Sequence, residues 1–199
     1  MDKQIIFNGE RISRTKVRNN ILKVYNQTDT FSDWYKEAHQ FSKYLSDKYK
    51  TPLNSVIGII SALSPRLNWD KNKEIAEFFL ATNKVIRDNG KQIHMTVPCN
   101  KAKLIRLNDD EQYVLDTLSG DKTKSFYLNI KYPDREVNVT VDRHAIAIAL
   151  GRIATQKEHS LTNKSYKFFE DCYKWTAEQL GIRPLLLQSI TWETWRNIK

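Results

Sequence analysis

Hydrophobic residues recur at helical spacing along most of the chain. Residues 17–25 and 34–49 each carry apolar side chains at about every third or fourth position, which places them along one side of a helix. The residues from Thr30 to Asp33 supply capping groups before the second of these helices. The next segment, Leu53 to Leu63, reads LNSVIGIISAL and is apolar nearly all round. It therefore predicts a buried helix.

The rest of the chain continues the mostly helical pattern. Strand-like alternation is confined to residues 136–141, and residues 91–100 look irregular. A long helix is expected to end at Asn89-Gly90, since this pair favours a turn. The further helices are expected at residues 69–88, 101–107 and 111–118, and on either side of 181–184. We predict an all-α fold of about ten short helices, as one domain over residues 1–199 or as two lobes.

The composition narrows the class of protein. At 199 residues the chain is long enough to bury a core of its own. No apolar run approaches the length of a membrane span, and the N-terminus lacks the apolar segment of a signal peptide. The two cysteines, Cys99 and Cys172, have no metal-ligand spacing, which favours a reducing compartment. These features predict a cytoplasmic protein without a membrane partner, a metal or another cofactor.

The net charge is positive. Lys and Arg number 32 and Asp and Glu number 23, which gives a formal net charge of +9. Such an excess favours a polyanionic partner such as DNA, because basic groups release the counterions of the phosphates that they neutralise. A positive charge also keeps many proteins soluble without any such partner.

One segment has the pattern of a helical hairpin. A helix ends at Leu118, a tight turn follows at Ser119-Gly120-Asp121, and a new helix is expected from Lys122 or Thr123. Backbone N–H groups at such a turn bind phosphate, and Lys122 and Lys124 add positive charge. The structural alternative is an ordinary helix–helix connection in which glycine caps the first helix.

The hairpin and the residues that follow it resemble a known superfamily. Leu118 to Lys124, LSGDKTK, and Val141 to His144, VDRH, match the spacing of the helix-hairpin-helix DNA glycosylases, which include endonuclease III. Upstream, the sequence IISALSPRLNWDKNK is similar to their buried helix that breaks into a DNA-facing loop. The resemblance covers residues 56–151. It implies a two-lobed helical helix-hairpin-helix glycosylase-like fold, with the hairpin at 111–131 and the catalytic aspartate helix at 142–154.

The sequence departs from endonuclease III at several points. The second glycine of the family's hairpin is Lys122 here, and the four iron–sulfur cysteines are absent. The segments ALSPR..W..N, K..SFY.NI, VTVDRHA and LQ.ITW.TWR are together similar to small phage-encoded proteins of unclear activity, which would place the protein in a host cytoplasm.

The resemblance also implies roles for individual residues. Asp142 falls on the catalytic carboxylate. Its local sequence alone favours a plain helix N-cap, and its fixed distance from the hairpin favours the catalytic role. Lys124 falls on the lysine that attacks the sugar, and Lys122 competes for that role. An amine nucleophile must be neutral, so burial or neighbouring cations must lower its pKa. The residues expected to contact DNA are Ser119, Gly120, Thr123, Arg143, His144, Ser64, Arg66, Trp69 and Asn72.

Three functions are compatible with these residues. The first is a DNA glycosylase, with or without lyase activity, that excises a modified or damaged base flipped out of double-stranded DNA. The second is a phage enzyme of base hypermodification that uses the same fold. The third is a non-catalytic DNA-binding protein that retains the hairpin. A carboxylate at position 142 is required for the first two functions and dispensable for the third.

Overall fold

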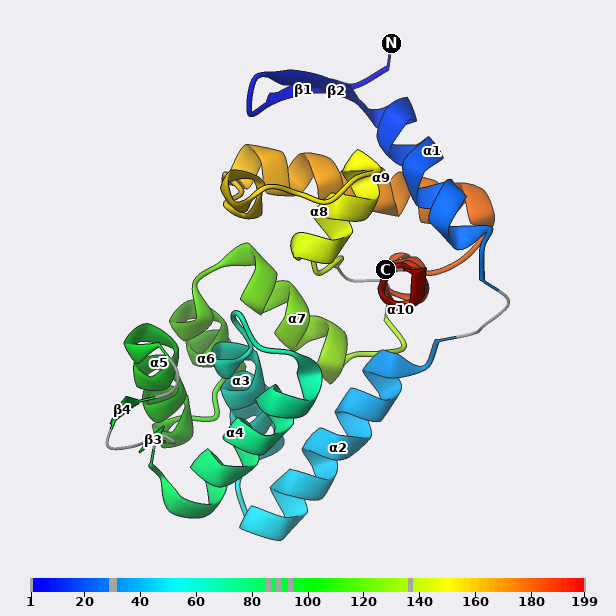
Figure 1. Ribbon diagram of the computed structural model, residues 1–199. Coiled ribbons are helices and arrows are strands. Elements are labelled where there is room, and N and C mark those ends of the chain that lie inside the picture. Colours follow the sequence, from blue (N-terminus) through cyan, green and yellow to red (C-terminus); the bar gives the residue numbers. More distant parts are fainter. Residues whose placement is uncertain are drawn as a thin grey trace. The chain divides into compact units, whose positions relative to one another are not determined.

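The fold is mostly helical. A computed structural model describes residues 2–28, 32–84, 87–88, 91–92, 95–135 and 138–198. In these ranges the chain forms ten α-helices, one 3-10 helix and two small two-stranded sheets, which confirms the predicted all-α character. The chain divides into two compact units, one made of Met1–Tyr35 with Asp134–Lys199 and the other of Lys36–Pro133 (Figure 1).

The first unit packs three helices around the short buried helix α8. Its elements are β1 (Gln4–Phe7), β2 (Glu10–Ser13), α1 (Arg14–Tyr25), α8 (Arg143–Leu150), the 3-10 helix η1 (Gln156–His159), α9 (Asn163–Leu180) and α10 (Pro184–Ile198). The residues from Ala145 to Leu150 are all buried, because apolar side chains cover every side of this helix. They join a core to which α1 and α9 also contribute.

The unit opens with a β-hairpin that the sequence analysis did not predict. Strands β1 and β2 pair antiparallel, with Ile5 opposite Ile12. Asn8 and Gly9 join them, and both have positive φ, 47° and 86°, as the common two-residue hairpin turn requires. An Asn-Gly pair between alternating apolar residues is a strong hairpin signal. The prediction that strand-like alternation is confined to residues 136–141 was therefore wrong.

In the second unit, helix α3 lies at the centre. The elements are α2 (Trp34–Tyr49, whose first two residues belong to the first unit), α3 (Leu53–Leu63), α4 (Trp69–Thr82), β3 (Arg87–Asp88), β4 (Lys91–Gln92), α5 (Thr96–Leu107), α6 (Glu111–Leu118) and α7 (Asp121–Lys131). Helix α3 packs against α4, α5, α6 and α7 (Figure 1). From Ser55 to Leu63 all its residues are buried, as predicted.

Several element boundaries differ from those predicted. Helix α4 ends at Thr82, not at residue 88, because Asn83 turns into the left-handed conformation with φ 54°. Helix α5 starts at Thr96 within the stretch expected to be irregular. Pro98 is tolerated there since the first N–H groups of a helix have no partner inside it. Helix α8 ends at Leu150, where left-handed Gly151 caps it, and not at residue 154.

Three other expectations lie wholly or partly outside the described residues. They are the capping residues at 30 and 31, the helix stop at 89–90 and the start of the strand-like segment at 136–137. Residues 138–141, which are described, form no strand.

We expect larger side chains at Gly58 to destabilise the protein. A Cβ there would lie 2.7 Å from Val114 Cγ1 and 2.8 Å from Ile105 Cγ2, and β-branched neighbours on helices have little rotamer freedom. Gly58→Val should cost about 3 kcal/mol of unfolding free energy. Gly58→Ala should cost less, since alanine gains up to about 1 kcal/mol of helix propensity. Urea denaturation measures both, and a Gly58→Val protein of wild-type stability would contradict this packing.

Candidate nucleic-acid interface

The predicted hairpin is present at residues 111–131. Helix α6 ends at Leu118, and α7 begins at Asp121, one residue earlier than expected. The left-handed residue is Ser119, with φ 61°, whereas Gly120 is extended with φ −89°. Glycine therefore does not cap the first helix here. A Cβ on Gly120 would meet Thr123 Oγ1 at an ordinary 3.6 Å, so the backbone of this turn does not require glycine.

A lysine that the sequence analysis did not single out holds the turn. Lys101 Nζ, from α5, donates to the Leu118 carbonyl and to Ser119 Oγ, both at 2.6 Å. The Gly120 N–H donates to the same Leu118 carbonyl at 2.8 Å. These bonds satisfy a carbonyl at the end of α6 that has no partner within its own helix. Only the folded chain brings Lys101 here, seventeen residues before Leu118.

The predicted hairpin residues differ in how they are presented. Ser119 and Gly120 are exposed, and Lys122, Thr123 and Lys124 are half-buried. The Thr123 hydroxyl bonds inward, at 2.9 Å from the Gly120 carbonyl oxygen. Its side chain therefore supports the turn. The Ser119 and Gly120 N–H groups donate to the Leu115 and Leu118 carbonyls, so the groups available to phosphate are the two lysines and the first N–H groups of α7.

The loop after α3 presents one of its predicted contacts to solvent and buries another. Arg66 is exposed and has positive φ, 65°. Asn72 is buried, and its Nδ2 donates to the Ile60 carbonyl at 3.1 Å. Asn72, which was expected to contact DNA, is therefore not presented to solvent, because its side chain ties α4 to α3.

Ser64 and Trp69 are each partly buried. The Ser64 hydroxyl donates to the Ser61 carbonyl at 2.9 Å, so it closes the end of α3. Trp69 is half-buried and packs edge-on against Phe41, with ring centroids 6.0 Å apart. It anchors the start of α4 and exposes part of its ring.

A cavity lies where the loop and the hairpin meet. Its volume is about 350 Å³, within the range of ligand pockets. Its wall is mostly apolar, with a single lysine: it includes Ala62, Pro65, Val97, Pro98, Lys101 and Leu118. Both segments predicted to face DNA thus border the same hollow in the second unit.

Asp142 caps helix α8 in the first unit. Its Oδ1 accepts from the His144 and Ala145 N–H groups at 3.0 and 2.8 Å, as expected of an N-cap. Its Oδ2 accepts no hydrogen bond from the residues that the structure describes. The carboxylate is half-buried. One oxygen thus serves the fold while the other remains available.

The backbone before Asp142 is tied to α9. The Val141 N–H donates to the Tyr166 hydroxyl at 3.2 Å, and this hydroxyl donates to the Val139 carbonyl at 2.9 Å. Nearby, the Tyr35 hydroxyl bonds to Gln188 Oε1 at 2.7 Å and to Thr140 Oγ1 at 3.1 Å. The position of Asp142 is therefore set in part by buried hydrogen bonds of the residues just before it.

Aromatic and cationic groups gather around His144, near the start of α8. The His144 ring meets the edge of Trp192 at 6.2 Å between centroids, and Trp34 meets Trp192 at 5.7 Å. The Arg196 guanidinium lies over the Trp192 ring at 4.7 Å, and Arg143 is exposed. Trp192 comes from the segment LQSITWETWR, which the resemblance to endonuclease III left unexplained. The tertiary structure places this segment next to VTVDRHA.

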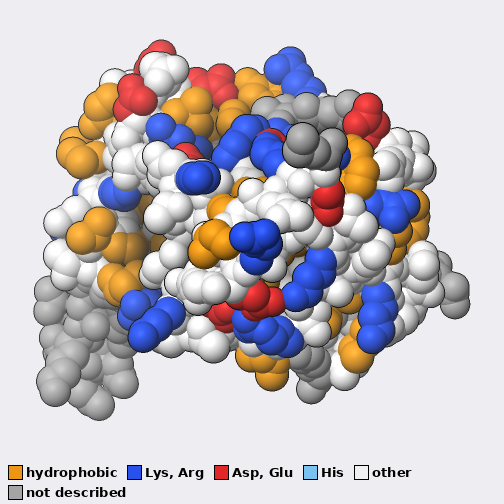
Figure 2. Space-filling model, turned by 90° about the horizontal axis from the view of Figure 1, so that it is seen from above, with side chains coloured by type: hydrophobic (Ala, Val, Ile, Leu, Met, Phe, Trp, Pro, Cys, Tyr) orange, Lys and Arg blue, Asp and Glu red, His pale blue; other side chains and the backbone are white. Residues whose placement is uncertain are grey.

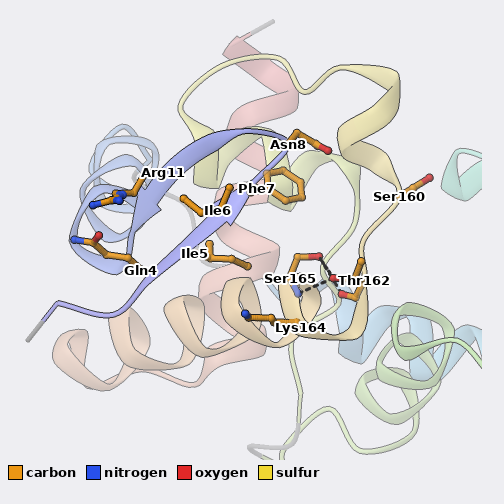
Figure 3. Close-up of a pocket in the computed structure, with 10 residues that line it drawn as sticks. All are labelled: Gln4, Ile5, Ile6, Phe7, Asn8, Arg11, Ser160, Thr162, Lys164 and Ser165. Atoms are coloured by element: carbon orange, nitrogen blue, oxygen red, sulfur yellow. Dashed lines mark hydrogen bonds between the residues drawn. The ribbon is translucent and has the colours of Figure 1, made fainter.

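Positive charge is not confined to the hairpin. Figure 2 shows Lys and Arg side chains spread over one face of the molecule, among fewer Asp and Glu. A second hollow of about 480 Å³ lies between the β1–β2 hairpin and the start of α9, with Arg11 and Lys164 at its sides (Figure 3). The Thr162 and Ser165 hydroxyls there bond to each other at 3.0 Å. None of the predicted site residues lines this hollow.

The predicted residues thus fall into two sets. The hairpin and the Ser64–Trp69 loop belong to the second unit, whereas Asp142, Arg143 and His144 belong to the first. In the described part of the chain, no group of three or more His, Cys, Asp or Glu side chains is placed to hold a metal. No helix there is long and apolar enough to cross a bilayer.

Comparison with known proteins places this mostly helical chain in a family. It belongs to a family of unknown function, DUF7178, whose model matches residues 3–199. No curated protein and no solved structure matches the chain.

We expect Arg66 and Trp69 to respond differently to replacement. Arg66→Gly removes the exposed side chain and favours the left-handed backbone, so stability should hold or rise by up to about 1 kcal/mol. Trp69→Ala should cost about 2 kcal/mol, because the ring packs on Phe41. If the loop enters DNA, both should reduce base flipping, read with 2-aminopurine in duplex DNA. Lys50→Gly is the control, since Lys50 also has positive φ, 49°, and should leave flipping unchanged.

Proposed function

We propose that this protein is a DNA glycosylase that excises a modified or damaged base from double-stranded DNA, with the two-lobed fold of the helix-hairpin-helix glycosylases. The observation that carries the proposal is the carboxylate of Asp142. It is held at the start of a buried helix by Oδ1 alone, and Oδ2 remains available. A residue needed only as a cap would serve equally well as Ser, Thr or Asn.

The chemistry needs a fixed negative charge near the sugar. As the bond between base and sugar breaks, positive charge develops at C1′, and a nearby carboxylate stabilises it. The same oxygen can accept a proton from an attacking nucleophile. Buried hydrogen bonds of Val141 and Thr140, the two residues before Asp142, hold this segment in place, so the carboxylate is positioned before the substrate binds.

DNA binding is assigned to the hairpin and the loop beside it. The start of α7 after the Ser119-Gly120 turn, with its first N–H groups and the side chains of Lys122 and Lys124, is proposed to bind the phosphate backbone. Arg66 and the exposed part of Trp69 are the side chains proposed to enter the duplex. Arg143 and His144, beside Asp142, are proposed to contact the strand that carries the reacting sugar.

Asp142→Asn tests the proposal most directly. Asparagine keeps the capping oxygen, so unfolding free energy should change by less than about 1 kcal/mol. Losing the charge should slow base release at least about 100-fold. Release is measured by mass spectrometry from duplexes carrying oxidised, alkylated, deaminated or hydroxymethylated bases. Asp110→Asn is the matched control, since Asp110 caps α6 in the same way.

The outcomes separate the three functions. A fully active Asp142→Asn protein would contradict the glycosylase. Dependence on Asp142 for a transferred group, with no free base released, would favour base hypermodification. Binding without any reaction would favour a DNA-binding protein.

Borohydride trapping tests the lyase step. If Lys124 attacks C1′ as the base leaves, an imine forms, and reduction should couple the protein covalently to the DNA. Lys124→Gln should abolish this adduct even at a protein concentration that saturates the DNA, and Lys122→Gln should not. Loss of trapping in Lys122→Gln alone would move the nucleophile to Lys122. No adduct with the wild type, but continued base release, would indicate that water is the nucleophile.

A further inference from the structure

Two lysines flank the turn of the hairpin: the Lys101 Nζ, from α5, donates to the Leu118 carbonyl and Ser119 Oγ, and Lys124 lies near the start of α7. Burial first, and the nearby positive charge of Lys124 second, lower the pKa of Lys101. In the part of the chain that the structure describes, neither lysine forms an ion pair with a carboxylate. Like charges held together in partly buried surroundings repel each other, and a bound anion would relieve the repulsion.

One of the three N–H donors of the Lys101 ammonium forms no hydrogen bond with the described residues. An ammonium group has three N–H donors, and two of them go to the Leu118 carbonyl and Ser119 Oγ, both at 2.6 Å. Both acceptors are uncharged, so they orient the ammonium without neutralising it. The third donor and the full charge remain for a ligand.

The cavity beside Lys101 is suited to a nucleoside, the group that is attached to each phosphate of a DNA strand. Its wall is mostly apolar, with Ala62 and Pro65 from the loop side and Val97 and Pro98 from the start of α5. A nucleoside has flat apolar faces and is joined directly to a phosphate. The cavity volume of about 350 Å³ falls within the range of pockets that bind small ligands.

We propose that Lys101 and Lys124 bind one phosphate of a DNA strand, and that the nucleoside attached to this phosphate lies in the apolar cavity. This inference rests on the proposed function only for the choice of DNA as ligand. It assigns Lys101, Lys124 and the cavity to binding, and it takes Lys124 as a charged phosphate ligand and not as the neutral amine of a lyase step.

The phosphate contact is tested by affinity and salt dependence. Lys124→Met should weaken binding of a duplex oligonucleotide several-fold and reduce the slope of log affinity against log salt by about 0.9. This side chain makes no hydrogen bond within the described residues, so the turn should stay intact. Lys101→Met should act in the same direction, and Lys103→Met, on the exposed side of α5, should have little effect.

A double variant shows whether the two lysines share one phosphate. If they do, Lys101→Met with Lys124→Met should cost less affinity than the sum of the single changes, because residues that contact the same group are coupled. Wild-type affinity and salt slope in Lys124→Met would overturn the proposal. So would strict additivity of the two changes.

Filling the cavity tests the nucleoside. Val97 is 64% exposed, so Val97→Phe can project a ring into the cavity without disturbing the core. It should weaken binding of a 2-aminopurine oligonucleotide several-fold and reduce the change in its fluorescence. Leu104→Phe is the matched control, since Leu104 is 47% exposed on the same helix and does not line the cavity. Equal effects of the two changes would exclude the cavity.

The two proposals can fail separately. If Asp142→Asn stops base release while Lys124→Met binds like the wild type, the glycosylase stands and the phosphate site is wrong. If the lysine variants lose affinity while the wild type releases no base, the phosphate site stands and the glycosylase is wrong.

Discussion

The close approach of three helices at Gly58 is the constraint on which the second unit depends. Val114 of α6 and Ile105 of α5 occupy the space that a side chain there would fill. Because α3 is buried along most of its length, α5 and α6 must pack directly on its backbone. The end of α3, the start of α5 and the turn after α6 then border one cavity. The candidate DNA-binding surface is thus a consequence of helix packing.

In the first unit, the burial of α8 determines where the candidate catalytic residue lies. A helix that is apolar on all sides must lie within the core, and its polar start must then lie at the edge of that core. Asp142 is the residue at this start, held by its own capping bonds and by the contacts of Val141 and Thr140. The same residue can therefore stabilise the fold and offer a carboxylate oxygen to a substrate.

The hairpin differs from α3 and α8 because a charged side chain stabilises its turn. Lys101 stabilises the turn through uncharged acceptors, so the structure keeps a positive charge at the point where it orders the backbone. A carboxylate in this place would bring two charges together and cancel them. A protein that only needed a stable turn would gain nothing from leaving the charge without a counterion. This is the physical reason to connect Lys101 with an anionic ligand.

Local sequence determined much of this protein. Helical periodicity predicted α2, α3 and α6 at their observed residues. The spacing of apolar residues along the chain shows which side of a helix is buried, so it also locates the helix. The hairpin followed from its turn residues. The turn at Asn8-Gly9 could also be predicted from the sequence, because two adjacent residues are enough to indicate it, but it was not among the predicted elements. The end of α4 at Thr82 was harder to predict from the sequence. Asn83 ends this helix in the left-handed conformation, which asparagine adopts only in some contexts.

Only the tertiary structure decided what the side chains do. Asn72 looked like a surface contact and is buried against Ile60, and Thr123 turns inward to the hairpin. Lys101 reaches Leu118 from another helix, and Trp192 of α10 meets His144 of α8. Periodicity tells which residues share a helix face, but it does not tell which faces meet. These contacts join distant segments, so they exist only once the helices have packed.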